Sequence, residues 1–255
     1  MKAKVAKGRK LFVPYLTAGL PSPQAFIDLF SELSWCADAI EVGVPFSDPI
    51  MDGPIIQESS QRALALGVTL PSCLKLVAEA LRESSVPAVV MTYFNPVHHL
   101  TIPKFAATMS DAGIQGVIVP DLPFEESGDL DSALRRKSIA HIQMIAPSTP
   151  PERAAMLAKK SQGWIYAVSR LGVTGEQIEL AAAAEEVVAK IKHHASAPVL
   201  LGIGISSGDQ AAQAAIYADG VIVGSAIVKL VLAGDLDGAV ALSKQIRVSL
   251  DSVTP

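Results

Sequence analysis

Eight short runs of aliphatic and β-branched residues recur along the chain, and a stretch with helical spacing of apolar positions follows each run. The runs span residues 11–17, 38–44, 87–93, 116–122, 141–147, 164–169, 197–203 and 219–225. Apolar residues recur at three- and four-residue intervals between them, most clearly in residues 25–33, 72–84 and 179–194. Buried strands that alternate with amphipathic helices predict βαβ units and a parallel sheet.

The number of these units favours a closed barrel. Eight strand–helix units in 255 residues match the usual size of a (β/α)8 TIM barrel, an α/β fold. An open doubly wound sheet is the rival, but it would place a glycine-rich turn after the first strand. Residues 17–24 instead read TAGLPSPQ, with one glycine and two prolines. Because no linker or low-complexity tract interrupts the chain, we expect residues 1–255 to form a single catalytic barrel domain.

Composition narrows the class of protein further. Half of the residues are apolar but only 5% are aromatic, which predicts an aliphatic core. A net charge of −4 argues against general nucleic-acid binding, which needs a basic face. Two cysteines give no disulfide framework, and the N-terminal residues lack a signal-peptide pattern. The most apolar late stretch, residues 220–234, contains Lys229 and is too short to span a bilayer. We therefore expect a soluble, cytoplasmic protein.

The second predicted strand carries a glutamate where an aliphatic residue would be ordinary. Side chains alternate between the two faces of a strand, so Ile40 and Val42 should face the helices, and Glu41 should face the barrel interior. Burial raises the pKa of a carboxyl group and costs free energy unless a partner compensates. A structural ion pair with a lysine or arginine is one interpretation. A general acid or base with a pKa closer to neutrality is the interpretation that we favour.

A proline-rich loop, PFSDPIMDGPIIQ, follows this strand and presents Asp48 and Asp52 near the predicted barrel mouth. Aspartate before proline or glycine is an ordinary turn former, so either residue alone carries little information. The combination of Glu41 and Asp52 is more specific. It predicts one buried and one more solvated carboxyl group, an arrangement suited to two different roles in proton transfer.

Glycines cluster after the last three predicted strands. The segments are SRLGVTGEQ with Gly172 and Gly175, GIGIS with Gly202 and Gly204, and VGSAIVK with Gly224 and Ser225. In (β/α)8 barrels the loops after strands seven and eight often bind phosphate through backbone N–H groups and a helix N-terminus. Each glycine alone could be a plain turn. Together they predict a phosphate site, with Ser225 as a helix cap and hydroxyl donor.

The remaining candidates form an apolar set at the predicted strand ends, and these residues are either plain core or the wall of a pocket for an aromatic ligand. They are Tyr15, Met91, Tyr93, Ile118, Tyr166 and Ile203. The histidines occur as adjacent pairs or alone, which is not the spacing of a helical metal site, and no metal is predicted. Neither cysteine has a histidine in an evident catalytic motif, so thiol catalysis is not expected either.

These segments, taken in order, resemble the tryptophan synthase α subunit family. The resemblance rests on YLTAGLP, EVGVPFSDPIMDGPIIQ, MTYFNPV, VPDLPFEES, SRLGVTG, GIGIS and DGVIVGSAIVK, and it extends from about residue 10 to residue 248. It implies a (β/α)8 barrel that cleaves indole-3-glycerol phosphate to indole and glyceraldehyde 3-phosphate. The segment from Glu41 to Asp52 is its most specific part.

The resemblance also implies a role for each matched residue. Glu41 would be the general acid/base that protonates the indole ring carbon, and Asp52 would hold the indole N–H. The phosphate would lie against Gly175, Gly204, Gly224 and Ser225. The indole pocket would comprise Tyr15, Tyr93, Ile118, Thr174 and Ile203, with Thr174 on a loop that closes over the substrate.

The implied partner is a β subunit in an α2β2 complex. It carries pyridoxal phosphate and receives the indole, whereas the α chain needs no cofactor. The loop that runs from Pro45 to Asp52, together with Asn95, would face this partner.

Two positions depart from the family pattern. Leu20 stands where the first loop usually has an aspartate, and Ile203 stands where a phenylalanine is common. The first change affects hydrogen bonding near the barrel mouth, and the second removes an aromatic wall from the indole pocket. Neither touches Glu41 or Asp52. Three other functions remain open: a regulatory subunit that binds the β subunit but cleaves poorly, a lyase that works without a partner, and another phosphate-binding barrel such as a sugar-phosphate isomerase.

Overall fold

The computed structural model describes residues 1–84, 86–168, 177–202 and 204–253, with only the backbone given for residues 177–184. Its parallel strands pair in the order β5-β4-β3-β2-β1-β9-β8-β7-β6. Their bounds are β1 Leu11–Thr17, β2 Ile40–Gly43, β3 Ala88–Met91, β4 Gly116–Ile118, β5 Ala140–His141, β6 Gln143–Ile145, β7 Ile165–Val168, β8 Val199–Gly202 and β9 Gly220–Val223.

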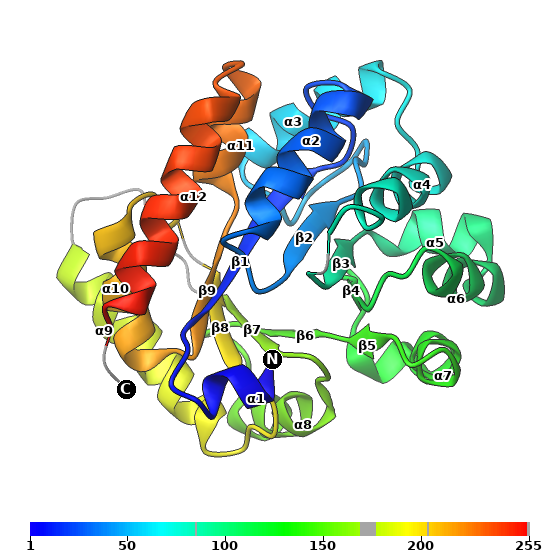
Figure 1. Cartoon of the computed structure of the whole chain (residues 1–255). Coiled ribbons are helices and arrows are strands. Elements are labelled where there is room, and N and C mark those ends of the chain that lie inside the picture. Colours follow the sequence, from blue (N-terminus) through cyan, green and yellow to red (C-terminus); the bar gives the residue numbers. More distant parts are fainter. Residues whose placement is uncertain (85, 169–176, 203, 254–255) are drawn as a thin grey trace.

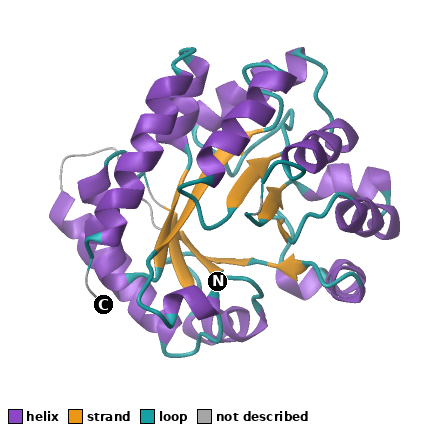
Figure 2. Cartoon of the chain, viewed as in Figure 1, coloured by secondary structure: helices purple, strands orange, loops and turns teal. Residues whose placement is uncertain are grey.

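The two ends of this strand order are consecutive in the chain. Only Ile142 separates β5, which pairs with β4, from β6, which pairs with β7. The Ile142 N–H still donates to the carbonyl of Val117 in β4, at 3.0 Å. The two short strands therefore make up the fifth predicted run, and the eight predicted runs correspond to a nearly closed barrel (Figure 2). The predicted TIM-barrel fold is confirmed.

Helices surround the strands on the outside (Figure 1). Their bounds are α1 Lys2–Val5, α2 Pro23–Ser34, α3 Pro54–Ala65, α4 Leu70–Ala80, α5 Phe94–Leu100, α6 Ile102–Asp111, α7 Gly128–Arg136, α8 Pro151–Lys160, α9 Gln177–Lys192, α10 Gly208–Tyr217, α11 Ser225–Leu232 and α12 Leu236–Asp251, with a 3-10 turn η1 at Phe124–Glu126. The connections after β2 and β3 each carry two helices, whereas the pattern predicted a simple alternation.

Local sequence explains where several helices begin. The hydroxyl of Ser22 accepts a hydrogen bond from the Ala25 N–H, and Pro23 occupies the first helical position of α2. Thr69 and Ser72 form a reciprocal capping box at the start of α4. Asp235 caps α12 by accepting from the Gly238 N–H. These caps satisfy N–H groups that have no partner within the helix.

Each strand contributes to two apolar layers. Ile40 and Val42 lie in the large cluster between the strands and the helices. Ala39, on the other face of the same segment, belongs to the cluster that fills the barrel interior, together with Leu11, Val13 and other residues. The predicted two-residue alternation is therefore confirmed, and it places the side chain of Glu41 on the interior face.

The N-terminal end of the barrel is closed by α1 and an ion cluster. Met1 and Val5 pack against the interior cluster at this end of the barrel. Asp38, which is fully buried just before β2, accepts hydrogen bonds from Lys4, Arg9 and Arg247. Burial alone would raise the pKa of Asp38, but the hydrogen bonds from Lys4 and Arg9 outweigh it and lower the pKa. The side chains at this end of the barrel stabilise the fold, and the candidate active site lies at the opposite end of the strands.

Three further findings concern membrane-spanning helices, metal ligands and cysteines. Within the described ranges no single helix is long and apolar enough to cross a bilayer; α3 and α4 meet that test only as a pair bent by 97°. No group of three or more His, Cys, Asp or Glu side chains in the part of the chain that the structure describes is arranged to hold a metal ion. Cys36 and Cys73 are both buried and free.

Candidate active site

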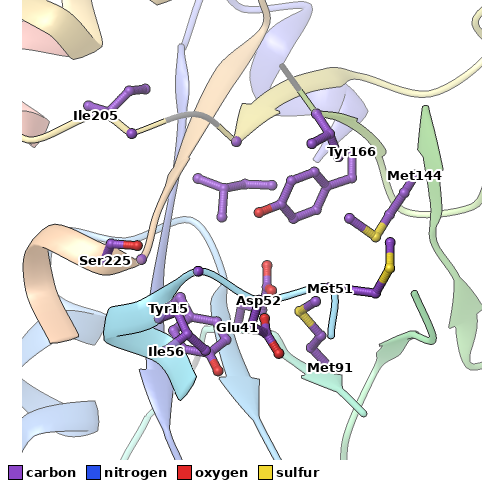
Figure 3. A pocket seen from close by; sticks show the side chains of 16 residues that line it. Tyr15, Glu41, Met51, Asp52, Ile56, Met91, Met144, Tyr166, Ile205 and Ser225 are labelled. Atoms are coloured by element: carbon purple, nitrogen blue, oxygen red, sulfur yellow. The ribbon is translucent and has the colours of Figure 1, made fainter. Parts of the chain in front are cut away.

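A cavity of about 180 Å³ opens at the C-terminal ends of the strands. Its polar lining includes Glu41, Asp52 and Ser225, and its apolar lining includes three methionines (Figure 3). In that view Met51, Met91 and Met144 lie on one side, and Ser225 lies on the other. The cavity therefore has an apolar side and a side rich in glycine and serine, with carboxyl groups between them.

Glu41 projects into this cavity from the middle of the sheet. It is 1% exposed, and β2 pairs it with Tyr15 of β1 and Val89 of β3. Burial, followed by the negative charge of Asp52, raises the pKa of the Glu41 carboxyl from 4.5 to about 8. Among the described residues, Oε2 has no hydrogen-bond partner and no lysine or arginine forms a salt bridge with Glu41. The structural interpretation, a glutamate held by an ion pair, is therefore not what these residues form. A neutral carboxyl group can instead donate a proton into the cavity.

Asp52 lies near Glu41 but is held differently. The Tyr93 hydroxyl donates a hydrogen bond to its Oδ2 at 2.8 Å and accepts one from the Met51 N–H at 3.0 Å. Gln57 donates to the backbone carbonyl of Asp52 at 2.9 Å. Burial raises the pKa of Asp52, and the hydrogen bond from Tyr93 acts in the opposite direction. Burial thus raises the pKa of both carboxyl groups, whereas the sequence predicted one buried and one more solvated group; Asp52 is half-buried.

Two tyrosines lie over glycines of the neighbouring strand. A Cβ atom built on Gly43 would overlap the hydroxyl end of Tyr15, and one built on Gly202 would overlap the ring of Tyr166. In both pairs the glycine is opposite the residue two positions after the tyrosine. The absence of a side chain at Gly43 and Gly202 thus makes the space in which both aromatic rings extend toward the cavity (Figure 3).

The glycine-rich side of the cavity is formed by the ends of β8 and β9. Gly202, Gly204, Gly224 and Ser225 all line it. Gly224 is the N-cap of α11 and Ser225 is its first helical residue, so the capping position falls one residue earlier than predicted. Ser225 is exposed, and its hydroxyl and the helix N-terminus face the same opening.

Other predicted site residues lie elsewhere. Ile118 is fully buried in the interior cluster and does not line the cavity. Tyr93 does not line it either; its hydroxyl group contacts Asp52 and Met51, which do. Thr174, Gly175 and Ile203 lie outside the described residues. Leu20, the departure in the first loop, is 5% exposed and packs in the layer between strands and helices.

Comparison with known proteins identifies the family of this chain. The family profile of the tryptophan synthase alpha chain matches residues 1–250. The chain belongs to this family. The tryptophan synthase alpha chain of Oceanobacillus iheyensis is 39% identical over 248 residues, which cover 96% of this chain and 94% of that one. The tryptophan synthase alpha chain of Geobacter sulfurreducens is 44% identical over 225 residues, covering 87% and 84%.

Solved structures of the family have the same fold. Tryptophan synthase subunit alpha from Legionella pneumophila superposes with a TM-score of 0.90 at 30% identity, covering 99% of this chain and 97% of that one. A structure of Mycobacterium tuberculosis tryptophan synthase gives a TM-score of 0.90 at 39% identity, covering 98% and 95%. The tryptophan synthase alpha chain barrel is therefore present over nearly the whole chain.

The sequence pattern missed part of the cavity wall. Met51, Ile56, Met144 and Ile205 line it without having been predicted. Met144 could have been found, because it has the same strand parity as Ile142 in the fifth run and so faces the interior. The path of the loop that carries Met51 depends on its contact with Tyr93, for which the sequence gives no local signal.

Proposed function

We propose that this chain cleaves indole-3-glycerol phosphate to indole and glyceraldehyde 3-phosphate, with Glu41 as general acid/base. The observation that carries the proposal is the carboxyl group of Glu41. It is buried in the cavity, its pKa is raised to about 8, and it lies near a second carboxyl group. Membership of the tryptophan synthase alpha chain family supplies the substrate.

The reaction balances with these groups. The Glu41 carboxyl gives its proton to indole carbon 3, which places positive charge on the ring nitrogen. The Glu41 carboxylate then takes the proton of the hydroxyl group next to the ring, and the carbon–carbon bond breaks. Its electron pair restores the aromatic indole, and the former hydroxyl carbon becomes the aldehyde. Asp52 accepts the indole N–H hydrogen bond and stabilises the positive charge while it exists. Glu41 ends protonated, ready for another cycle.

The two sides of the cavity suggest how the substrate is oriented. The methionine side suits the indole ring. Of the residues that the family resemblance assigns to the indole pocket, Tyr15 lines the cavity, Tyr93 and Ile118 do not, and Thr174 and Ile203 lie outside the described residues. The phosphate belongs on the opposite side, against Gly175, Gly204, Gly224 and Ser225. Support comes from Gly204, Gly224 and Ser225, which line the cavity where α11 presents its N-terminus.

The chain is proposed to act as one catalytic domain over residues 1–255, in the cytoplasm, inside an α2β2 complex. The partner is the tryptophan synthase beta subunit, which holds pyridoxal phosphate; the alpha chains of this family need no cofactor. The loop of residues 45–52 and Asn95 form the proposed contact. Ile50 and Met51 in this loop are 80% and 57% exposed, which supports a surface that a partner covers. Asn95 is exposed at the start of α5.

Indole release from indole-3-glycerol phosphate tests the proposal. The chain should release indole slowly alone and many-fold faster after addition of a tryptophan synthase beta subunit. Rapid release without any partner would favour a lyase that works alone. The absence of release in both assays, with beta-subunit activity still enhanced, would contradict the proposal and favour a regulatory subunit.

A further inference from the structure

The hydroxyl group of Tyr93 makes two hydrogen bonds to consecutive residues of one loop. It donates to the Asp52 carboxylate at 2.8 Å and accepts from the Met51 N–H at 3.0 Å. Tyr93 itself comes from a different part of the barrel, after β3 and directly before α5. A single hydroxyl group thus ties the loop after β2 to the end of the neighbouring strand.

The ring that carries this hydroxyl is fixed. Tyr93 is 4% exposed, and Phe46 stacks on it with ring centroids 4.8 Å apart and an angle of 22° between the planes. A buried, stacked ring has little freedom to move its hydroxyl away from the loop. The hydroxyl group is therefore a hydrogen-bond donor in a fixed position, whereas Asp52, which accepts from it, lies on a loop without regular structure.

We infer that Tyr93 is a positioning residue that holds Oδ2 of Asp52, so that Oδ1 is presented to the ring N–H of the substrate. This inference rests on the proposed function and gives Tyr93 a different role from the pocket wall that the sequence predicted. Gln57 holds the same loop through a backbone carbonyl, so it anchors the loop without touching the carboxylate.

The hydrogen bond also has an electrostatic consequence. Burial raises the pKa of Asp52, and the donated hydrogen bond of Tyr93 opposes that rise. Removal of the hydroxyl group should therefore raise the pKa of Asp52, and a larger fraction of the enzyme should carry a protonated Asp52 in mild acid. A protonated Asp52 cannot stabilise a positive charge on the indole ring.

Tyr93→Phe tests the inference in the complex with a beta subunit. A hydrogen bond to a charged group contributes enough for kcat to fall about tenfold or more, with KM changed less. The acid limb of the pH profile of kcat should move to higher pH. Tyr217→Phe, the same change at the end of α10, should leave both kcat and the acid limb of its pH profile unchanged. Gln57→Ala loosens the loop without removing the carboxylate's donor, so it should leave the acid limb in place.

Replacement of Tyr93 by 3-fluorotyrosine keeps the shape and strengthens the donated hydrogen bond, so the acid limb should move to lower pH. This arm remains decisive if Tyr93→Phe does not fold. Two results would overturn the inference. One is a wild-type kcat together with an unmoved acid limb in Tyr93→Phe, and the other is an unmoved acid limb with fluorotyrosine. In either case, cleavage by the wild-type protein would still support the proposed function. Failure of the wild-type complex to release indole would instead overturn the proposed function.

Discussion

At the scale of single residues, the burial of Glu41 costs free energy of folding. A carboxyl group with no ion pair loses hydration when it is buried, and the nearby charge of Asp52 adds to that penalty. The protein avoids part of the cost because Glu41 keeps its proton at neutral pH. A general acid must also keep its proton at neutral pH. The burial of Glu41 therefore both destabilises the fold and raises the pKa that the chemistry needs.

This burial has a measurable consequence for stability. The pKa of Glu41 rises from 4.5 to about 8 in the folded protein, so the folded state binds more protons than the unfolded state in that range. The contribution of protonated Glu41 to the free energy of unfolding should be fully present below pH 4.5 and should decrease as the pH rises to about 8. Glu41→Gln removes this ionisation. In urea titrations its unfolding free energy should gain about 4 kcal/mol on wild type between pH 5 and pH 9. The same pH dependence in both proteins would contradict the raised pKa.

At the scale of elements, glycines on two strands make the room for aromatic side chains in the cavity. Gly43→Ala would place a methyl group where the Tyr15 hydroxyl lies. The tyrosine would have to move, at a cost of about 1–3 kcal/mol in unfolding free energy, and indole release should fall with it. Gly128→Ala is the matched control, because a Cβ there meets nothing within 4 Å. Equal denaturation curves for Gly43→Ala and Gly128→Ala would show that the space at Gly43 is not limiting.

Strand-level features of the site could be predicted because their geometry is local. The position of Glu41 on the interior face follows from a two-residue period that every strand obeys. The fit of Tyr166 over Gly202 could not be predicted, because it depends on the stagger between two strands distant in sequence. The position of Asp52 depends on Tyr93, about forty residues away, and no periodicity encodes that contact. Thus the sequence pattern predicted the strands and the carboxyl groups, but not how the loops meet.

At the scale of the whole molecule, Asp38 joins the two ends of the chain beneath the barrel. Lys4 and Arg9 come from the N-terminal segment, and Arg247 comes from α12. Asp38→Asn should cost about 3 kcal/mol in unfolding free energy, because it leaves the largely buried Arg247 with only the exposed Asp251 as a charged partner.

The contribution of Asp38 to the free energy of unfolding depends on pH in the opposite direction to that of Glu41. The pKa of Asp38 is lowered, so its contribution is present near neutral pH and is lost as the pH falls through that lowered pKa. The difference in unfolding free energy between wild type and Asp38→Asn should therefore shrink in acid. Asp28→Asn, on the exposed face of α2, should show almost no effect. A constant difference across the acid range would contradict the ion cluster.

The closure of the barrel is a further property of the whole chain. Eight repeated units predicted eight strands, but the described part of the chain has nine, because Ile142 divides the fifth run, and this division was not visible in the sequence. No glycine or proline in residues 140–145 marks a break, and only the pairing of the two halves with β4 and β7 separates them.

The most direct test is indole release from indole-3-glycerol phosphate by Glu41→Gln in the complex with a beta subunit. Loss of a general acid/base should lower kcat by about 10²–10⁴-fold. The fold should be retained, because glutamine has nearly the same shape. Glu79→Gln, on the exposed face of α4, is the matched control and should cleave at the wild-type rate. Turnover by Glu41→Gln close to that of wild type would contradict the assignment of Glu41.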